Sequence, residues 1–280
     1  MAVVLVAPWG ASAFAAPGGV RIQRGVPYRV VAGATLRLDV FLPRVGQSRP
    51  LVVVVHGGGW RGGDRARFAP GEALVAPRAQ VLARRGFVVA SVDYRVGPAG
   101  RFPAAASDVA AAVQWLRRHA RSLRVDPTRI ALFGASAGGN LAALVAMQGR
   151  GRLDREARVA AVVSWSGPMD LTRFDAELGG PARRPFVEQY LGCAPTSCPA
   201  RYAASSPFNL VDATDPPMLV VNASREIVPL EQATLMARRL SAFHVPHQLL
   251  VVPGTRHAAQ YATAAWPATL RFLHHQLHAG

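Results

Sequence analysis

The sequence predicts a single α/β domain: a mostly parallel central sheet with helices on both faces and a small lid-like insertion. The first observation is that apolar runs of strand length alternate with amphipathic segments of helix length through most of the 280 residues. The second is that runs such as residues 51–55 are continuously apolar, as in strands buried on both faces. A chain of this length can bury one large core, and no linker divides it.

The elements follow in order along the chain. Residues 36–42 alternate apolar and polar side chains, which predicts an early strand with one solvent-exposed face. A fully buried central strand is expected at residues 51–55, and further strands are expected at residues 87–92, 129–133, 159–164, 218–221 and 247–252. Helices are expected at residues 73–85, 107–121, 137–147, 230–243 and 264–277, the first ending at Gly86. The irregular segment of about residues 171–217 is expected to be a lid or substrate-binding insertion.

The formal net charge is +16, and every basic side chain is an arginine. The arginines are scattered in ones and twos, and no nucleic-acid-binding motif accompanies them. A nucleic-acid partner is therefore not expected. Two readings of the charge stay open: an arginine-rich surface without a partner, and attraction to anionic polymers or membrane surfaces.

Residues 1–15 are expected to be a secretory signal peptide, with residues 16–280 as the mature domain. Residues 2–15 are apolar or small, and Ala13-Phe14-Ala15 fits the small-x-small cleavage rule. A positive segment before them is missing, so either the true start lies upstream or the assignment is wrong. No later run approaches the roughly 18 apolar residues of a membrane-spanning helix, so no stable membrane insertion is expected.

Export bears on the two cysteines, Cys193 and Cys198, which lie close together in a proline-rich loop. An oxidising compartment favours a small disulfide loop between them, and free thiols are the alternative. Two cysteines without a nearby histidine do not indicate a zinc site, and no metal is expected.

The strongest local signal is the run Gly134-Ala135-Ser136-Ala137-Gly138, between the expected strand 129–133 and the expected helix 137–147. This arrangement is typical of a nucleophile elbow, in which glycines let the helix pack close to the strand. The serine then lies at a helix N-terminus, where free amides favour negative charge. Ser136 is the candidate nucleophile; the alternative is a glycine-rich turn.

A second signal directly follows strand 51–55, where three glycines stand between His56 and Trp60. Acyl transfer needs N–H donors aimed at the developing oxyanion, and glycines let backbone amides approach it. The candidate donors are the amides of Gly58, Gly59 and Ala137. Trp60 is a tentative substrate-binding residue, with ordinary packing as the alternative, and His56 is interpreted as structural.

Taken together, these motifs resemble those of α/β-hydrolases of the esterase/lipase superfamily, near the hormone-sensitive-lipase-like and feruloyl-esterase-like branches. The resemblance spans roughly residues 30–277 and implies ester hydrolysis with no metal or organic cofactor. The matching pieces are residues 56–60 with Gly62-Gly63-Asp64, then Asp93-Tyr94-Arg95, Phe102-Pro103, Asp108, Trp115-Leu116, and Asp126-Pro127 leading into residues 134–141.

The base is expected to be His257, in the loop between the last strand and the closing helix, where the resemblance places a catalytic histidine. Catalytic loops gather at the carboxyl ends of parallel strands, and among eight histidines only His257 and His56 lie at that end. The acid is expected after strand 218–221. The resemblance places an aspartate there, but this chain has Arg225 at that position. Glu226 follows it and is the predicted acid. Asp215 is a rival that precedes the strand.

The expected function is cleavage of carboxylic esters by a Ser136–His257–Glu226 triad, acting on a small-molecule or polymer-linked substrate. Alternatives are another serine hydrolase on the same scaffold, such as an arylformamidase or peptidase, and a catalytically inactive binding protein. The natural substrate and the oligomeric state do not follow from the sequence.

Overall fold

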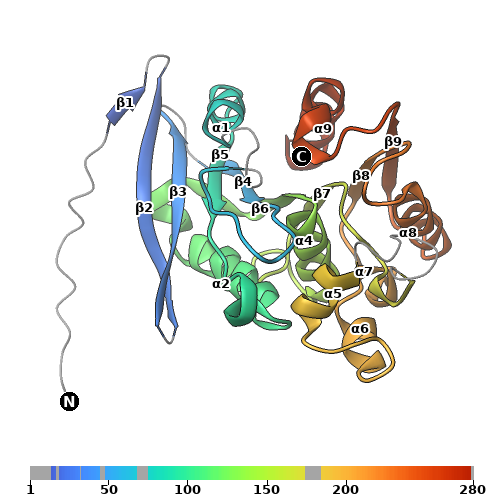
Figure 1. Ribbon diagram of the computed structural model, residues 1–280. Coiled ribbons are helices and arrows are strands. Elements are labelled where there is room, and N and C mark those ends of the chain that lie inside the picture. Colours follow the sequence, from blue (N-terminus) through green and yellow to red (C-terminus); the bar gives the residue numbers. More distant parts are fainter. Residues whose placement is uncertain are drawn as a thin grey trace.

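The computed structural model describes residues 14–16, 19–31, 33–44, 48–67, 75–173 and 184–278. Within these ranges, nine strands form one sheet in the order β1-β2-β3-β5-β4-β6-β7-β8-β9 (Figure 1). Three strands at one edge are antiparallel: β1 (Phe14–Ala16), β2 (Val20–Val31) and β3 (Ala34–Pro43). The other six run parallel: β4 (Arg49–Val55), β5 (Val88–Val92), β6 (Val125–Ala135), β7 (Ala161–Trp165), β8 (Met218–Ala223) and β9 (His247–Val252).

Helices cover both faces of this sheet, because alternate residues of each buried strand contribute to two separate cores. Val53 and Val55 face one core, whereas Val52 and Val54 face the other. The first core is covered by α2 (Ala104–Arg118), α3 (Ala120–Leu123), α4 (Ala137–Gln148) and α8 (Leu230–Ala242). The second is covered by α1 (Val75–Arg84) and α9 (Ala262–His278), which both lie above the sheet in Figure 1.

The mostly parallel sheet and its six parallel strands were predicted from the sequence, and each helix expected there has a counterpart. Of the last strand, β9, only Val252 is buried. Gly86 follows α1 with φ +95°, the left-handed conformation expected of a glycine at a helix end. Residues 73 and 74 of the first expected helix lie outside the described residues.

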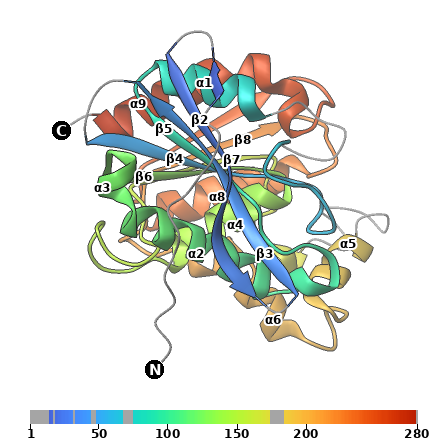
Figure 2. The same cartoon turned by 90° about the vertical axis from the view of Figure 1, so that its left-hand side faces the viewer.

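The early strand differs from its prediction in two ways. The predicted exposed face ends at Arg37, because Asp39 and Phe41 are buried along with their apolar neighbours in the strand. Asp39 is buried because it pairs with Arg65 at 2.8 Å and accepts the amide of Gly25 at 2.7 Å. The sequence prediction also missed β2, which pairs with β3 along its length; Figure 2 shows this ribbon crossing in front of the parallel strands.

The segment predicted as a lid contains short helices at the carboxyl side of the sheet. After the short helix η2 (Leu171–Arg173) come residues 174–183, which lie outside the described residues. Three helices follow, α5 (Arg184–Leu191), α6 (Pro199–Ala204) and α7 (Pro207–Leu210), which lie together in Figure 1. The expected signal peptide falls largely on residues 1–13, which are also outside the described residues, and Phe14–Ala16 pairs with β2.

Candidate active site

Ser136 stands in the sharp turn between β6 and α4. Its backbone has φ 54° and ψ −124°, a conformation that a non-glycine residue rarely adopts. The amide of Ser136 donates to the carbonyl of Trp165 at 2.7 Å, and its carbonyl accepts the amide of Asn140 at 3.1 Å. The strained turn is thereby held from the neighbouring strand β7 and from the first turn of α4. This is the backbone geometry of a nucleophile elbow.

The two glycines of the elbow are required by close backbone approach. A Cβ on Gly134 would lie 2.0 Å from the carbonyl oxygen of Gly138. A Cβ on Gly138 would lie 2.3 Å from the carbonyl oxygens of both Val55 and His56. Helix α4 can therefore start beside the end of β4 only because both positions lack a side chain.

The glycine loop after β4 lies beside this elbow. Gly58 and Gly59 have φ values of +116° and +60°, which favour glycine. Within the described part of the chain, the amides of Gly58, Gly59 and Ala137 have no hydrogen-bond acceptor. Ala137 opens α4, so its amide also carries the partial positive charge of a helix N-terminus. These three amides remain available to an oxyanion.

His56 holds this loop in place through ring stacking and hydrogen bonds. Its imidazole is buried and stacks on Tyr94 with ring centroids 4.1 Å apart. The Tyr94 hydroxyl donates to the carbonyl of His56 at 2.8 Å, and His56 Nδ1–H donates to the carbonyl of Gly57 at 2.7 Å. Burial lowers the pKa of His56 and so favours the neutral ring. Gly63 packs so closely that a Cβ there would lie 2.5 Å from His56 Nδ1.

Glu226 and His257 face each other across the ends of β8 and β9. Oε2 of Glu226 is hydrogen-bonded to Nδ1 of His257, and the Glu226 side chain is fully buried. The His257 side chain keeps 14 % of its surface exposed. The amide of His257 donates to Oε1 of Gln260 at 2.9 Å, which fixes the start of the following turn.

The structure distinguishes Glu226 from Arg225 and Asp215, the two other residues considered for the acid position. Arg225, at the usual position of the acid, is exposed and only its amide is held, at 3.0 Å from the carbonyl of Gly254. Asp215 lies before β8 and accepts the amide of Asp212 at 2.8 Å. Both of these aspartates pair with Arg150, and neither contacts His257.

Ser136 and His257 lie at the same end of the sheet, because both follow the carboxyl ends of parallel strands. Among the contacts of the described residues, no hydrogen bond joins Ser136 Oγ to Nε2 of His257. In serine hydrolases the hydrogen bond between nucleophile and base is often long without substrate and tightens in the reacting complex.

Sequence reasoning missed Ser166, which directly follows β7. Its buried hydroxyl donates to Oε1 of Glu226 at 2.7 Å and accepts the amide of Ala258 at 3.0 Å. The signal that could have found it is its place: a polar residue after a buried strand, at the edge where site residues gather.

Trp60 is buried against the predicted lid segment. It is 4 % exposed and stacks on Tyr190 of α5 with ring centroids 4.5 Å apart, and a substrate-binding role for it stays a prediction. The residue of α5 that reaches the glycine loop is Phe186. A Cβ on Gly59 would lie 2.8 Å from the Phe186 ring, and the guanidinium of Arg61 lies 4.8 Å from that ring's centroid.

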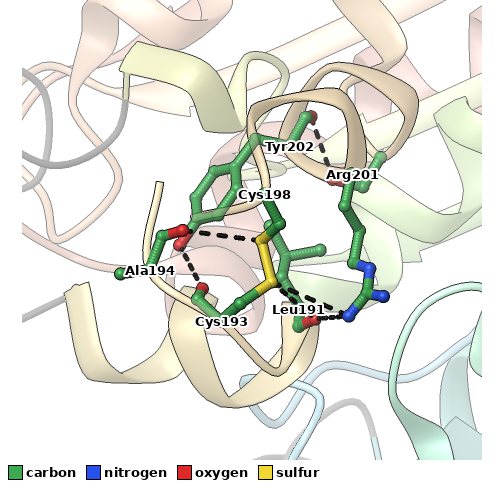
Figure 3. Close-up of a disulfide and its surroundings, with 7 residues drawn as sticks. Leu191, Cys193, Ala194, Cys198, Arg201 and Tyr202 are labelled. Carbon is green, nitrogen blue, oxygen red and sulfur yellow. Dashed lines mark hydrogen bonds between the residues drawn. A yellow bond between two sulfur atoms is a disulfide. The ribbon is translucent and has the colours of Figure 1, made fainter. Parts of the chain in front are cut away.

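The predicted disulfide between Cys193 and Cys198 is present in the structure (Figure 3). It closes the loop between α5 and α6, and the Tyr202 hydroxyl donates to the carbonyl of Cys193 at 3.0 Å. The described residues hold no group of three or more His, Cys, Asp or Glu side chains that could bind a metal ion. Nor does any helix in these ranges have the length and apolar character needed to cross a membrane.

The fold and the elbow define an α/β-hydrolase of the esterase/lipase superfamily, as the sequence motifs predicted. Residues 38–240 match the model of the BD-FAE family, and the chain belongs to that family.

Among curated proteins, the chain is 34 % identical over 206 residues to esterase LipC of Mycobacterium tuberculosis, an alignment covering 69 % of this chain and 48 % of LipC. It is 30 % identical over 222 residues to the probable carboxylic ester hydrolase LipM of the same organism, covering 75 % of this chain and 49 % of LipM. The chain therefore spans about half the length of these two relatives.

Two solved structures share the fold. A truncated carbohydrate esterase from gut microbiota superimposes with a TM-score of 0.77 at 22 % identity, covering 92 % of this chain and 96 % of that one. The butyrate-bound esterase Est2 of Thermogutta terrifontis superimposes with a TM-score of 0.73 at 26 % identity, covering 92 % of this chain and 94 % of Est2.

Proposed function

We propose that this chain hydrolyses carboxylic esters, with Ser136 as nucleophile, His257 as general base and Glu226 as the acid that orients the base. The observation that carries the proposal is the strained backbone of Ser136 at the carboxyl end of β6, beside three unpaired amides. Family membership and the likeness to esterases LipC and LipM support the same reaction.

Acylation follows from the positions of these groups. Oγ of Ser136 attacks the ester carbonyl carbon while Nε2 of His257 takes the hydroxyl proton, and the carbonyl oxygen becomes an oxyanion. The amides of Gly58, Gly59 and Ala137 then donate to that oxygen. The imidazolium passes its proton to the leaving alcohol, the C–O bond of the ester breaks, and an acyl-serine remains.

Deacylation repeats these steps with water as the nucleophile. Water gives a proton to His257 and adds to the acyl carbon; collapse of the intermediate returns the proton to Ser136 Oγ and releases the carboxylic acid. Glu226 keeps the Nδ1–H of His257 in place throughout and stabilises the imidazolium, because its buried carboxylate is hydrogen-bonded to that nitrogen. No metal or organic cofactor enters these steps.

The substrate is proposed to be a small-molecule or polymer-linked ester, with residues 171–217 acting as a lid. Helix α5 of this segment lies against the glycine loop through Phe186, so the aromatic ring stands close to the proposed oxyanion donors. We also propose that the protein works outside the cytoplasm, since the Cys193–Cys198 bond is of a kind that persists in oxidising compartments.

Labelling with a fluorophosphonate probe tests the proposal, because the probe reacts with an activated serine whatever the natural substrate. We expect the native protein to be labelled at Ser136, and Ser136→Ala and His257→Ala to be unlabelled while remaining folded. Heat-denatured protein is the control for non-specific reaction. A folded protein that takes no label would favour the inactive binding protein instead.

Substrate class is tested separately from serine reactivity. p-Nitrophenyl esters from acetate to palmitate, together with methyl ferulate, report acyl preference; an N-formylaniline and a peptide amide report the alternative hydrolases. Turnover of the amides above that of every ester would favour the arylformamidase or peptidase reading.

A further inference from the structure

Ser166 has an unusual backbone and a buried side chain. It follows β7 with φ 51°, in the left-handed region that non-glycine residues seldom adopt, and its residue surface is fully buried. Such a conformation persists only where surrounding contacts hold it, and it concentrates at functional sites. The amide of Ser166 donates to the carbonyl of Val221 at 2.7 Å, which ties the residue to β8.

The hydroxyl of Ser166 has three partners, and counting protons fixes its direction. Oγ lies 2.7 Å from Oε1 of Glu226, 2.7 Å from the Tyr261 hydroxyl and 3.0 Å from the amide nitrogen of Ala258. An ionised carboxylate can only accept, so the single Ser166 proton points to Glu226. Oγ then accepts from Ala258, and the Tyr261 proton is shared between Oγ and the carbonyl of Val221, 3.1 Å away.

This arrangement joins the two residues of the proposed triad that lie on different loops. Ala258 directly follows His257, so Ser166 holds the acid with one contact and the backbone next to the base with another. Oε1 of Glu226 has one further donor, the amide of Ala223 at 2.7 Å. Oε2 is thereby left to face His257.

We propose that Ser166 is a positioning residue for the Glu226–His257 pair, an inference that rests on the proposed function. It contacts no reacting atom. Loss of its hydroxyl removes one of the two donors to Oε1 of a fully buried carboxylate and leaves the buried amide of Ala258 without its acceptor. Removing a partner that orients a catalytic group in this way lowers activity, because the oriented group loses its productive geometry.

A merely structural role has a different signature, and the chain offers matched variants to separate the two. Ser166→Ala removes the hydroxyl, and Ser166→Gly removes it while relieving the positive φ. Ser164→Ala is the control, because Ser164 is a buried serine of β7 whose Oγ has no hydrogen-bond partner among the described residues. Tyr261→Phe leaves the Ser166–Glu226 contact intact and is expected to have a smaller effect.

The experiment measures kcat and KM on an activated ester, the melting temperature, and the downfield proton resonance of His257 Nδ1–H by NMR. We expect Ser166→Ala and Ser166→Gly to lower kcat by about tenfold or more with KM within twofold. We also expect both to shift or broaden the Nδ1–H resonance, whereas Ser164→Ala changes neither kcat nor the resonance.

Two results overturn the inference. One is a kcat within twofold of the native value in folded Ser166→Gly or Ser166→Ala; the other is an Nδ1–H resonance that neither variant moves. The resonance needs no substrate. If the native protein hydrolyses no ester, the proposed function fails, while the NMR comparison still decides whether Ser166 positions His257.

Discussion

Glu226 Oε2 and His257 Nδ1 share a hydrogen bond although the residues are 31 positions apart in the chain. They meet because β8 and β9 run parallel with Ala223 opposite Val252, so the loops that follow begin at the same level. A short turn brings the glutamate carboxylate back to the amide of Ala223 at 2.7 Å. The resemblance places an aspartate at position 225, where this chain has an arginine. A glutamate side chain is longer than an aspartate, so Glu226 reaches the imidazole from the next position.

Glu226→Gln is expected to lower kcat by about two to four decades while leaving the fold intact. The amide keeps the shape of the side chain but loses the negative charge that orients His257 and stabilises its imidazolium. Steady-state kinetics on one activated ester at one pH measure the effect. Arg225→Ala is the neighbouring control, and a modest change is expected because its side chain is exposed. A kcat for Glu226→Gln within threefold of the native value would mean that the acid lies elsewhere.

The parallel core of the fold could be predicted because β4, β5, β7 and β8 are buried on both faces and are therefore largely apolar in sequence. Strand β2 gave a weaker pattern. It contains Gly25 and Pro27, and its register with β3 shifts twice, so no simple alternation marks it. Asp39 was misjudged as exposed because the arginine that neutralises it, Arg65, comes from a distant loop.

The candidate site could be predicted where one short motif carries the geometry, as around Ser136. The place of Trp60 was less predictable, because Tyr190 of α5 covers it from a segment with no regular pattern. Ser166 escaped prediction for a related reason: the three partners of its hydroxyl lie 60, 92 and 95 positions away in the chain. Contacts between such distant residues depend on the completed fold.

Gly138→Ala is expected to destabilise the protein by about 3 kcal/mol or to prevent folding, because the methyl group would overlap two backbone oxygens at 2.3 Å. Backbone atoms of β4 cannot move aside as a flexible side chain could. Urea unfolding, with the amount of soluble protein recorded, measures the effect. Gly151→Ala is the control: nothing lies within 4 Å of the new Cβ, and only its φ of +74° opposes it, at about 1 kcal/mol. Equal losses in both variants would contradict this account of the elbow.

Asp215→Asn tests the opposite end of β8. Burial raises the pKa of Asp215 to about 6, so in the folded protein the carboxyl still binds a proton at pH 5, where the unfolded chain has lost it. The folded state binds more protons between about pH 4 and pH 6, and its stability therefore falls as pH rises through that window. We expect the variant to lose this part of the pH dependence while its kcat stays close to native. Urea unfolding at pH 4.5 and 7.5 measures the difference. A collapse of activity would instead reinstate Asp215 as the acid.

The double variant Cys193→Ser/Cys198→Ser is expected to be less stable by about 2 kcal/mol, because the bond closes only a short loop and so removes little entropy from the unfolded chain. The loss should be confined to the region of α5 and α6, where Tyr202 and Arg201 hydrogen-bond the carbonyls of Cys193 and Leu191. Thermal unfolding with and without reductant is the measurement. Reductant should lower the melting temperature of the native protein to that of the variant and leave the variant unchanged. A reductant effect of equal size on the double variant would show that the bond is not its cause.

The same double variant is expected to change substrate binding. Because α5 also lies on the glycine loop through Phe186, KM for long acyl esters is expected to change more than kcat for acetate.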